Sequence, residues 1–275
     1  MTSVPWKVLP WSPRDTFAND EWKWACHARL GIAQPSIKGL PTRCTCAPRT
    51  DIAGGHHFLR CQVGGGPIAT HDALRDVIRA CCADAGLHAQ IEAIGVLPGS
   101  NERPADILAD NMVIDTTVVD AHPHGRSRSV KAWSERANIP GFEARAAEGR
   151  KRDHVSVGGG GARMEDRVKA SGREFIPLAF DTSGTPGASF CKFFKKISDI
   201  AVDRRGHDRK VFKAKWTIRI AMRMALVRAR VGLKRAHTVA GRRAEGKRFR
   251  GASTDPLRPA HAGPLMEMPN GHRPV

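Results

Sequence analysis

Three things are scarce in this sequence of 275 residues: tyrosine, long apolar runs and acidic side chains. Tyrosine is absent altogether and arginine outnumbers lysine, which is typical of a protein from a GC-biased genome. No apolar run approaches the roughly 20 residues that a membrane span needs, and the N-terminus lacks the pattern of a signal peptide. We therefore expect no membrane association, and a soluble intracellular protein that is nuclear if its source is a eukaryote.

The shortage of acids leaves a formal net charge of +18 and a sequence pI near 10.3. Within 203–250, 17 Lys and Arg stand against three acids, so this segment carries +14 of the total. A basic block of this size usually indicates a polyanionic partner, most often nucleic acid. We expect DNA as the partner, with RNA as the alternative. A solubilising basic tail in an arginine-rich protein is the competing interpretation.

Seven cysteines do not indicate a disulfide framework in an intracellular protein. Only Cys44, Cys46 and Cys61 cluster, in a turn-rich segment that also contains His56 and His57. Three sulfurs and one imidazole suit tetrahedral Zn²⁺, and four protein ligands would make such a site structural. Because Cys-x-Cys is tighter than the usual Cys-x-x-Cys pair, a set of incidental thiols is the alternative.

The expected elements alternate between helices and strands, which predicts an α/β or α+β protein. Apolar spacing indicates a helix over 69–86, a strand over 88–98, helices within 133–155 and 163–172, a buried strand over 173–180 and a helix over 189–202. We divide the chain into a helical lead-in (1–40), a Cys/His knuckle (41–66), a mixed-sheet domain (67–202), a basic amphipathic helix (203–237) and a disordered basic tail (238–275).

The basic helix has two faces. Its apolar side chains recur every three or four residues from Phe212 onward and share one side. On another side the same period is followed by Arg219, Arg223, Arg230 and Lys234. Such a cationic face is suited to lie along the phosphates of a nucleic acid. The alternative is an ordinary packed helix with a solvated cationic side.

The stretch RPADILADNMVIDTTVVD, residues 103–120, reads as a β-hairpin that turns at Asp110-Asn111. In that register Asp106 lies directly opposite Asp115, on the same face. Like charges directly opposite each other, with Cβ atoms about 4.5–5.5 Å apart, are destabilising. A divalent cation such as Mg²⁺ between the carboxylates would remove that cost. A one-residue slip would instead give a surface hairpin with two solvated acids.

The hairpin resembles the core of the PD-(D/E)xK nuclease superfamily, which has the restriction-endonuclease-like fold. In that family two acids hold the metal, and a lysine two residues after the second acid helps to activate water. Here that position is Thr117, so the resemblance implies a catalytic lysine from a following helix. Lys151 is the best candidate and Lys131 the next, while Glu92 in the preceding strand would add a third metal oxygen.

In matched order over about 28–220, the chain is similar to the C-terminal endonuclease region of non-LTR retrotransposon polyproteins. The motifs are RLGI, CTC, GGHHFLRC, GGGPIATHDALRDVI, RPADIL, VIDTTVV and FIPLAFDTSG. The resemblance implies Asp106 and Asp115 as Mg²⁺ ligands, and His71 at a helix start, where it touches phosphate or caps the helix with Asp72. It also implies a structural zinc knuckle formed by Cys44, Cys46, His57 and Cys61.

These inferences predict a restriction-endonuclease-like mixed sheet flanked by helices, preceded by a zinc knuckle and followed by the basic helix. The expected activity is metal-dependent DNA cleavage by a domain of a retroelement, and the expected protein partner is a reverse transcriptase encoded by the same element. The alternative is a catalytically inactive, truncated remnant that only binds nucleic acid. Thr117 and the glycine run after Lys151 favour that alternative.

Overall fold

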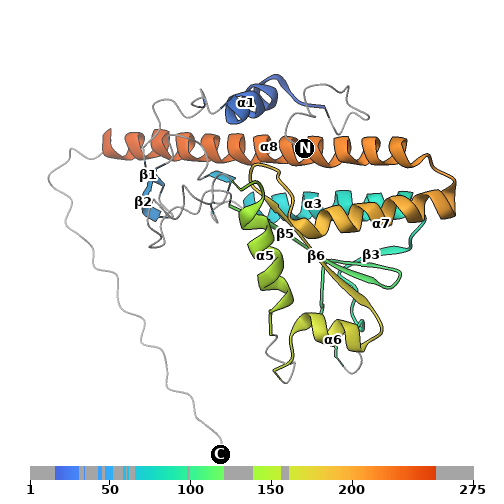
Figure 1. The fold of residues 1–275 in the computed structure, drawn as a ribbon. Helices are drawn as coiled ribbons and strands as arrows, with labels where there is room; N and C mark the ends of the chain where they lie inside the picture. Colours follow the sequence, from blue (N-terminus) through green and yellow to red (C-terminus); the bar gives the residue numbers. More distant parts are fainter. Residues whose placement is uncertain are drawn as a thin grey trace, which may run out of the picture.

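The structure, a computed structural model, describes residues 16–30, 34, 43–44, 47–51, 58–59, 61, 66–97, 100–120, 139–155 and 161–251. At 29, 43–44, 47–51 and 242–251 it describes the backbone alone. The expected zinc ligands Cys46 and His57, and the second lysine candidate Lys131, lie outside these residues. What is described is a mixed α/β fold around a four-stranded mixed sheet (Figure 1).

The sheet has the strand order β3-β4-β5-β6. Its strands are β3 (Ala89–Ile91), β4 (Ile107–Ala109), β5 (Met112–Val119) and β6 (Glu174–Asp181). β4 and β5 form the predicted antiparallel hairpin, and β6 runs parallel to β5 along its whole length. Three of the predicted hairpin pairs are confirmed: Ile107 with Ile114, Leu108 with Val113, and Ala109 with Met112.

The hairpin register is fixed at its turn. Asp110 has a φ of +50°, a left-handed conformation that Asp tolerates better than most residues. Its carboxylate accepts hydrogen bonds from the backbone N–H of His88 at 3.0 Å and from Arg204 at 2.7 Å. The turn is therefore tied to the start of β3 and to a helix, and a slip of the hairpin would break both contacts.

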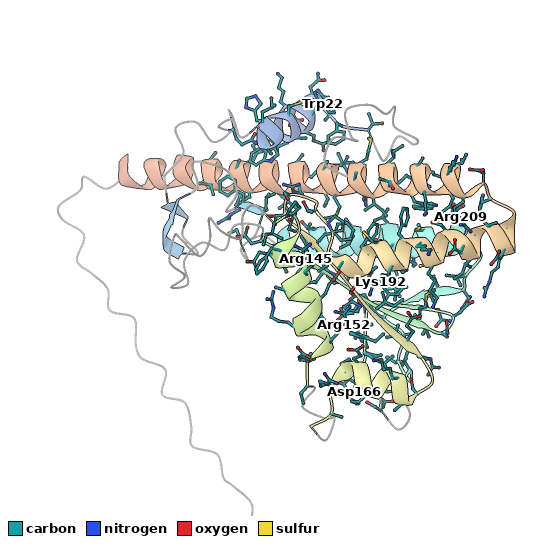
Figure 2. All side chains as sticks on the ribbon, viewed as in Figure 1. Trp22, Arg145, Arg152, Asp166, Lys192 and Arg209 are labelled. Atoms are coloured by element: carbon teal, nitrogen blue, oxygen red, sulfur yellow. The ribbon has the colours of Figure 1, made fainter. Side chains whose placement is uncertain are left out.

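Helices cover both faces of the sheet, and side chains fill the space between these layers (Figure 2). One face packs against α3 (Gly66–Asp84) and α7 (Ala188–Arg205), and the other against α5 (Phe142–Arg152) and α6 (Met164–Ala170). Strand side chains alternate between faces. Met112 and Ile114 belong to the larger core beneath α3 and α7, whereas Val113 packs with α6 and Val119 with α5.

The basic helix α8 (Arg209–Gly251) runs alongside α3 and α7 and continues past residue 237, where a tail was expected to begin. Its first half shares the main core through Phe212, Trp216, Ile220 and Met224. No described helix combines the length and the apolarity that crossing a bilayer requires.

A second side of α8 is buried as well, which the one-sided pattern did not predict. α1 (Asn19–Leu30) packs there, with Trp24 in a cluster that includes Ala229, Leu233 and Ala236. The Trp24 ring packs directly on Gly232. Because glycine has no side chain, it is the only residue type that lets the ring approach the helix backbone so closely. Helix α1, which lies within the expected lead-in, is therefore docked on the basic helix.

The Trp24–Gly232 contact predicts an asymmetry between two glycines of α8. In Gly232→Ala, the new Cβ would lie 2.2 Å from Cζ2 of Trp24, so α1 has to shift. We expect the free energy of unfolding in urea to fall by about 1–3 kcal/mol. In the control Gly241→Ala nothing lies within 4 Å of the Cβ, and helix propensity should stabilise the protein by up to about 1 kcal/mol. Equal losses in the two variants would contradict this docking.

Candidate functional site

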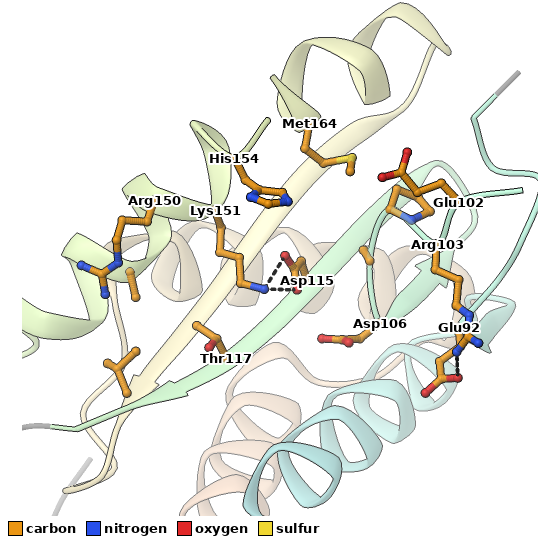
Figure 3. A pocket seen from close by; sticks show the side chains of 14 residues that line it. Glu92, Glu102, Arg103, Asp106, Asp115, Thr117, Arg150, Lys151, His154 and Met164 are labelled. Carbon is orange, nitrogen blue, oxygen red and sulfur yellow. Dashed lines mark hydrogen bonds and ion pairs between the residues drawn. The ribbon is translucent and has the colours of Figure 1, made fainter. Parts of the chain in front are cut away.

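A pocket of about 530 Å³ opens on the sheet face that carries α5 and α6 (Figure 3). Its position follows from β5, whose residues on that face change from the apolar Val113 to Asp115 and Thr117, and back to Val119. The polar pair lies between the patches that α6 and α5 cover. The charged and titratable residues that line the pocket are Glu92, Glu102, Arg103, Asp106, Asp115, Arg150, Lys151 and His154.

Asp106 lies in a bend immediately before β4. Its Oδ2 accepts hydrogen bonds from the backbone N–H and the hydroxyl of Thr116, each at 2.7 Å, and lies 3.1 Å from Nε2 of His71. Because β4 begins only at Ile107, the Asp106 carboxylate takes the place of a strand partner for Thr116. Asp106 is therefore not paired with Asp115 in the ladder as predicted, although both line one pocket.

The hydrogen bonds to Asp106 set its charge state. Burial alone would raise the pKa of this carboxyl, but the hydrogen bonds from His71 and Thr116 outweigh burial and lower the pKa below its usual value. Oδ1 accepts no hydrogen bond from the described residues. Asp106 is thus a stably ionised carboxylate with one oxygen available to a ligand.

His71 lies inside α3, which begins at Gly66, so the prediction that it caps a helix start is wrong. Its Nε2 faces Asp106, and its Nδ1 lies 3.4 Å from Oδ1 of Asp72. The hydrogen bond to Asp106 is the main reason that the pKa of His71 is raised. The imidazole orients the Asp106 carboxylate. This pairing could not be predicted from the sequence, because 35 residues separate the two partners.

Lys151 places an ammonium group beside Asp115. It projects from the last turn of α5, and its Nζ lies 3.0 Å from both carboxylate oxygens of Asp115 (Figure 3). Burial raises the pKa of Asp115, Lys151 counteracts this, and the nearby charge of Asp106 adds to the rise, so the net pKa is raised. The two aspartates therefore have pKa values shifted in opposite directions.

Glu92 does not join the two aspartates. It follows β3 with a φ of +49°, and its backbone N–H donates to the carbonyl oxygen of Asp106 at 2.8 Å. Its carboxylate instead forms ion pairs with Arg75, at 3.3 Å, and with Arg103. The prediction of Glu92 as a third metal oxygen therefore finds no support in this geometry.

The donor set at Asp106 and Asp115 suits a hard cation. Among the described residues, no group of three or more His, Cys, Asp or Glu side chains is arranged to hold a metal ion. Mg²⁺, however, commonly uses only one or two carboxylates and completes its octahedron with water and phosphate oxygens. An ionised Asp106, whose Oδ1 accepts no hydrogen bond from the described residues, lies beside Asp115 in an open pocket and meets that requirement.

The expected zinc ligands are only partly described. Cys44 lies in β1 (Arg43–Cys44), which pairs with β2 (Ala47–Asp51), and its side chain is not described. Cys61 is buried near Trp24 and Phe58, in the cluster between α1 and α8. Because Cys46 and His57 lie outside the described residues, the zinc knuckle stays a prediction.

The four cations predicted to form one face of α8 have different surroundings. The guanidinium carbon of Arg219 lies 5.0 Å from the ring centroid of Trp216, and Nε of Arg230 lies 2.7 Å from a carboxylate oxygen of Glu21. Arg223 is half-buried and Lys234 is exposed. These contacts favour the alternative of a packed helix for much of this side, since α1 neutralises one of its charges.

The orientation of α5 depends on a residue that the sequence did not point to. Glu148 is only 2% exposed, and its carboxylate oxygens lie 3.2 and 3.0 Å from the backbone N–H of Ser189 at the start of α7. It fits there because Gly187 has no side chain; a Cβ would lie 2.2 Å from Oε1 of Glu148. This contact fixes the helix from which Lys151 projects. A glutamate in a helical run gives no sequence signal of such burial.

No protein-family model matches the chain, and no curated protein is significantly similar to it in sequence. The site is therefore defined by its own geometry: two aspartates with oppositely shifted pKa values and one lysine, in a pocket on a four-stranded mixed sheet.

The shifted carboxyls predict an order of titration. In a ¹³C NMR titration, Asp106 should lose its proton at lower pH than a free aspartic acid, and Asp115 at higher pH. Lys151→Met removes the charge that favours ionised Asp115, so the pKa of Asp115 should rise further. Lys169→Met, which removes an exposed lysine paired with Glu165, should leave both carboxyls unchanged. An unchanged pKa of Asp115 in Lys151→Met would contradict the pairing.

Proposed function

We propose that this protein is a metal-dependent DNA endonuclease, in which Mg²⁺ held by Asp106 and Asp115 serves the hydrolysis of a phosphodiester bond. The observation that carries the proposal is the position of Lys151, whose Nζ contacts both oxygens of Asp115 in the pocket that Asp106 also lines. Two carboxylates and an ammonium group in one open pocket are the components that the PD-(D/E)xK resemblance requires. Lys151 would replace the lysine missing at Thr117.

The two aspartates have different tasks in this proposal. Asp106 is held by His71 and Thr116 and stays ionised, so it is a fixed ligand whose orientation does not depend on the substrate. Burial disfavours the ionised form of Asp115, so a nearby positive charge stabilises its carboxylate the most. Bound Mg²⁺ would lower the pKa of a coordinated water and offset the charge of the scissile phosphate.

Lys151 has the complementary task. Its side chain is 38% exposed, so the ammonium group is reachable from the pocket while it contacts Asp115. A phosphate above the carboxylates would meet this cation, which would stabilise negative charge as the attacking oxygen adds to phosphorus. The packing of Glu148 against the start of α7 keeps the ammonium group in reach.

The wider proposal rests on the order of the sequence motifs and on the net charge of the chain. We infer a restriction-endonuclease-like domain from a retroelement, acting with the reverse transcriptase of that element, with the basic residues of the chain drawing DNA to the pocket. The net charge of +18 supports a polyanionic partner. The competing function, a remnant that binds nucleic acid without cleaving it, differs only in chemistry and is separated by the assay below.

The endonuclease proposal predicts Mg²⁺-dependent nicking of supercoiled plasmid. Asp106→Asn and Asp115→Asn should abolish nicking and keep DNA binding, because each removes a metal ligand at nearly constant volume. Lys151→Met should slow nicking by about 10²–10³-fold, the usual effect of losing a group that stabilises developing charge. Lys169→Met, on the neighbouring helix α6, is the matched control and should nick at the wild-type rate. If the wild type nicks no better than Asp106→Asn, the chain is a binding remnant.

The knuckle is a separate proposal with its own measurement. We expect one Zn²⁺ per chain by mass spectrometry of the native protein, bound by Cys44, Cys46, His57 and Cys61. Cys46→Ser should lower that content and destabilise the N-terminal part, since structural zinc contributes on the order of 10 kcal/mol in such modules. Cys191→Ser, which changes an exposed thiol on α7, should retain the metal. Equal zinc content in the two variants would exclude the knuckle.

A further inference from the structure

The pocket has a guanidinium group at each end. In Figure 3, Arg150 lies beyond Lys151 on the α5 side, and Arg103 lies beyond Asp106 on the opposite side. Asp115 lies between them, paired with Lys151. The proposed cleavage centre is therefore bracketed by two arginines that take no part in holding a metal.

Arg103 is held in place by Glu92. The Glu92 carboxylate pairs with Arg103 on one side and with Arg75 on the other, and Arg75 is itself fixed by Asp76 at 3.0 Å. Glu92 pairs with these arginines from a left-handed backbone, a conformation that costs free energy in a residue other than glycine. Through these ion pairs Glu92 fixes Arg103 at one edge of the pocket.

Arg103 has donors left for a ligand. Its side chain is 59% exposed, and a guanidinium carries five N–H donors, of which the contact with Glu92 uses only part. Arginine binds phosphate through two parallel hydrogen bonds more readily than lysine does. Arg103 is thus a positioned cation that faces solvent at one end of the pocket.

Arg150 occupies the other end of the pocket. It is exposed on the last turn of α5, directly before Lys151 in sequence, and its side chain makes no hydrogen bond or ion pair with the described residues. A lone cation on the rim of a pocket that contains two aspartates is available to an anionic ligand.

We propose that Arg103 and Arg150 bind the two phosphates that flank the scissile phosphate on one DNA strand. The inference rests on the proposed function. Each strand of DNA carries one negative charge per roughly 3.4 Å of helix axis, so a strand that crosses the acid pair brings a phosphate near each end of the pocket. Without cations there, Asp106 and Asp115 would repel the strand. Both contacts are to the backbone, so these arginines position the strand and read no base.

The test uses full-length protein and a DNA oligonucleotide whose cleaved bond has been mapped. Single methylphosphonates remove the charge of the phosphate before or after the cleaved bond. For the wild type, kcat/KM should fall about tenfold with either substitution, since a hydrogen bond to a charged group is worth at least that factor. Arg103→Ala should be insensitive to one of the two substitutions, and Arg150→Ala to the other.

Arg145→Ala is the matched control for the two pocket variants. Arg145 is also an exposed arginine of α5 but does not line the pocket, so Arg145→Ala should keep the wild-type sensitivity to both methylphosphonates. If Arg103→Ala and Arg150→Ala also keep both sensitivities, the assignment of the flanking phosphates is overturned.

Failure of the inference is distinguishable from failure of the endonuclease proposal. If the wild type does not cleave, the slope of log affinity against log salt for the same oligonucleotide tests the contacts alone. Arg103→Ala and Arg150→Ala should each reduce that slope by about one, and Arg145→Ala should leave it unchanged. Wild-type slopes in both pocket variants would exclude the contacts whether or not the protein is an enzyme.

Glu92 is the positioning residue in this scheme, and its role has a distinct signature. Glu92→Ala should reproduce the methylphosphonate pattern of Arg103→Ala, because Arg103 loses its anchor, and Glu92→Gln should restore part of the wild-type pattern through its amide oxygen. The Mg²⁺ concentration at half-maximal rate should be the same in both variants as in the wild type. A shift of that concentration would instead make Glu92 a metal ligand.

Discussion

Repulsion between Asp106 and Asp115 is the constraint on which the rest of this structure depends. The two carboxylates line one pocket, and the charge of Asp106 adds to the burial that raises the pKa of Asp115. The protein offsets this repulsion differently at each aspartate. Asp106 is stabilised by His71 and Thr116, and Asp115 by Lys151. Oδ1 of Asp106 accepts no hydrogen bond from the described residues, so the pair keeps an oxygen that a divalent cation would use.

The surrounding fold serves this arrangement through α5. Ala144 and Ala147 bring the helix close to Ala179 of β6, since small side chains permit a short distance between helix and sheet. Glu148 then joins the same helix to the start of α7. Lys151, one turn further on, therefore projects toward Asp115 from a rigid element, so its contact needs no flexible loop.

The hairpin was predictable because its alternation and its turn agree. Lys151 was singled out because the resemblance implied a lysine from a following helix, and its ammonium group lies beside Asp115. Other features depend on contacts between residues far apart in sequence. The pairing of His71 with Asp106 spans 35 residues, and a helical pattern does not reveal it. Glu92, expected as a metal ligand, has a left-handed backbone and pairs with Arg75 and Arg103, and neither feature can be read from the sequence. The second buried side of α8 arises because α1 docks on it. The pairing of Arg230 with Glu21 of α1 depends on that docking, so the sequence of α8 alone does not predict it.

We propose above all that Asp106 and Asp115 bind one divalent cation between them. Manganese shares the oxygen preference of magnesium and broadens nearby NMR signals. Titration of Mn²⁺ into the protein should first broaden the carboxyl signals of Asp106 and Asp115, and Asp106→Asn should abolish the effect at the same concentration. Mn²⁺ that broadens other acidic residues first, or that acts equally in Asp106→Asn, would contradict the account.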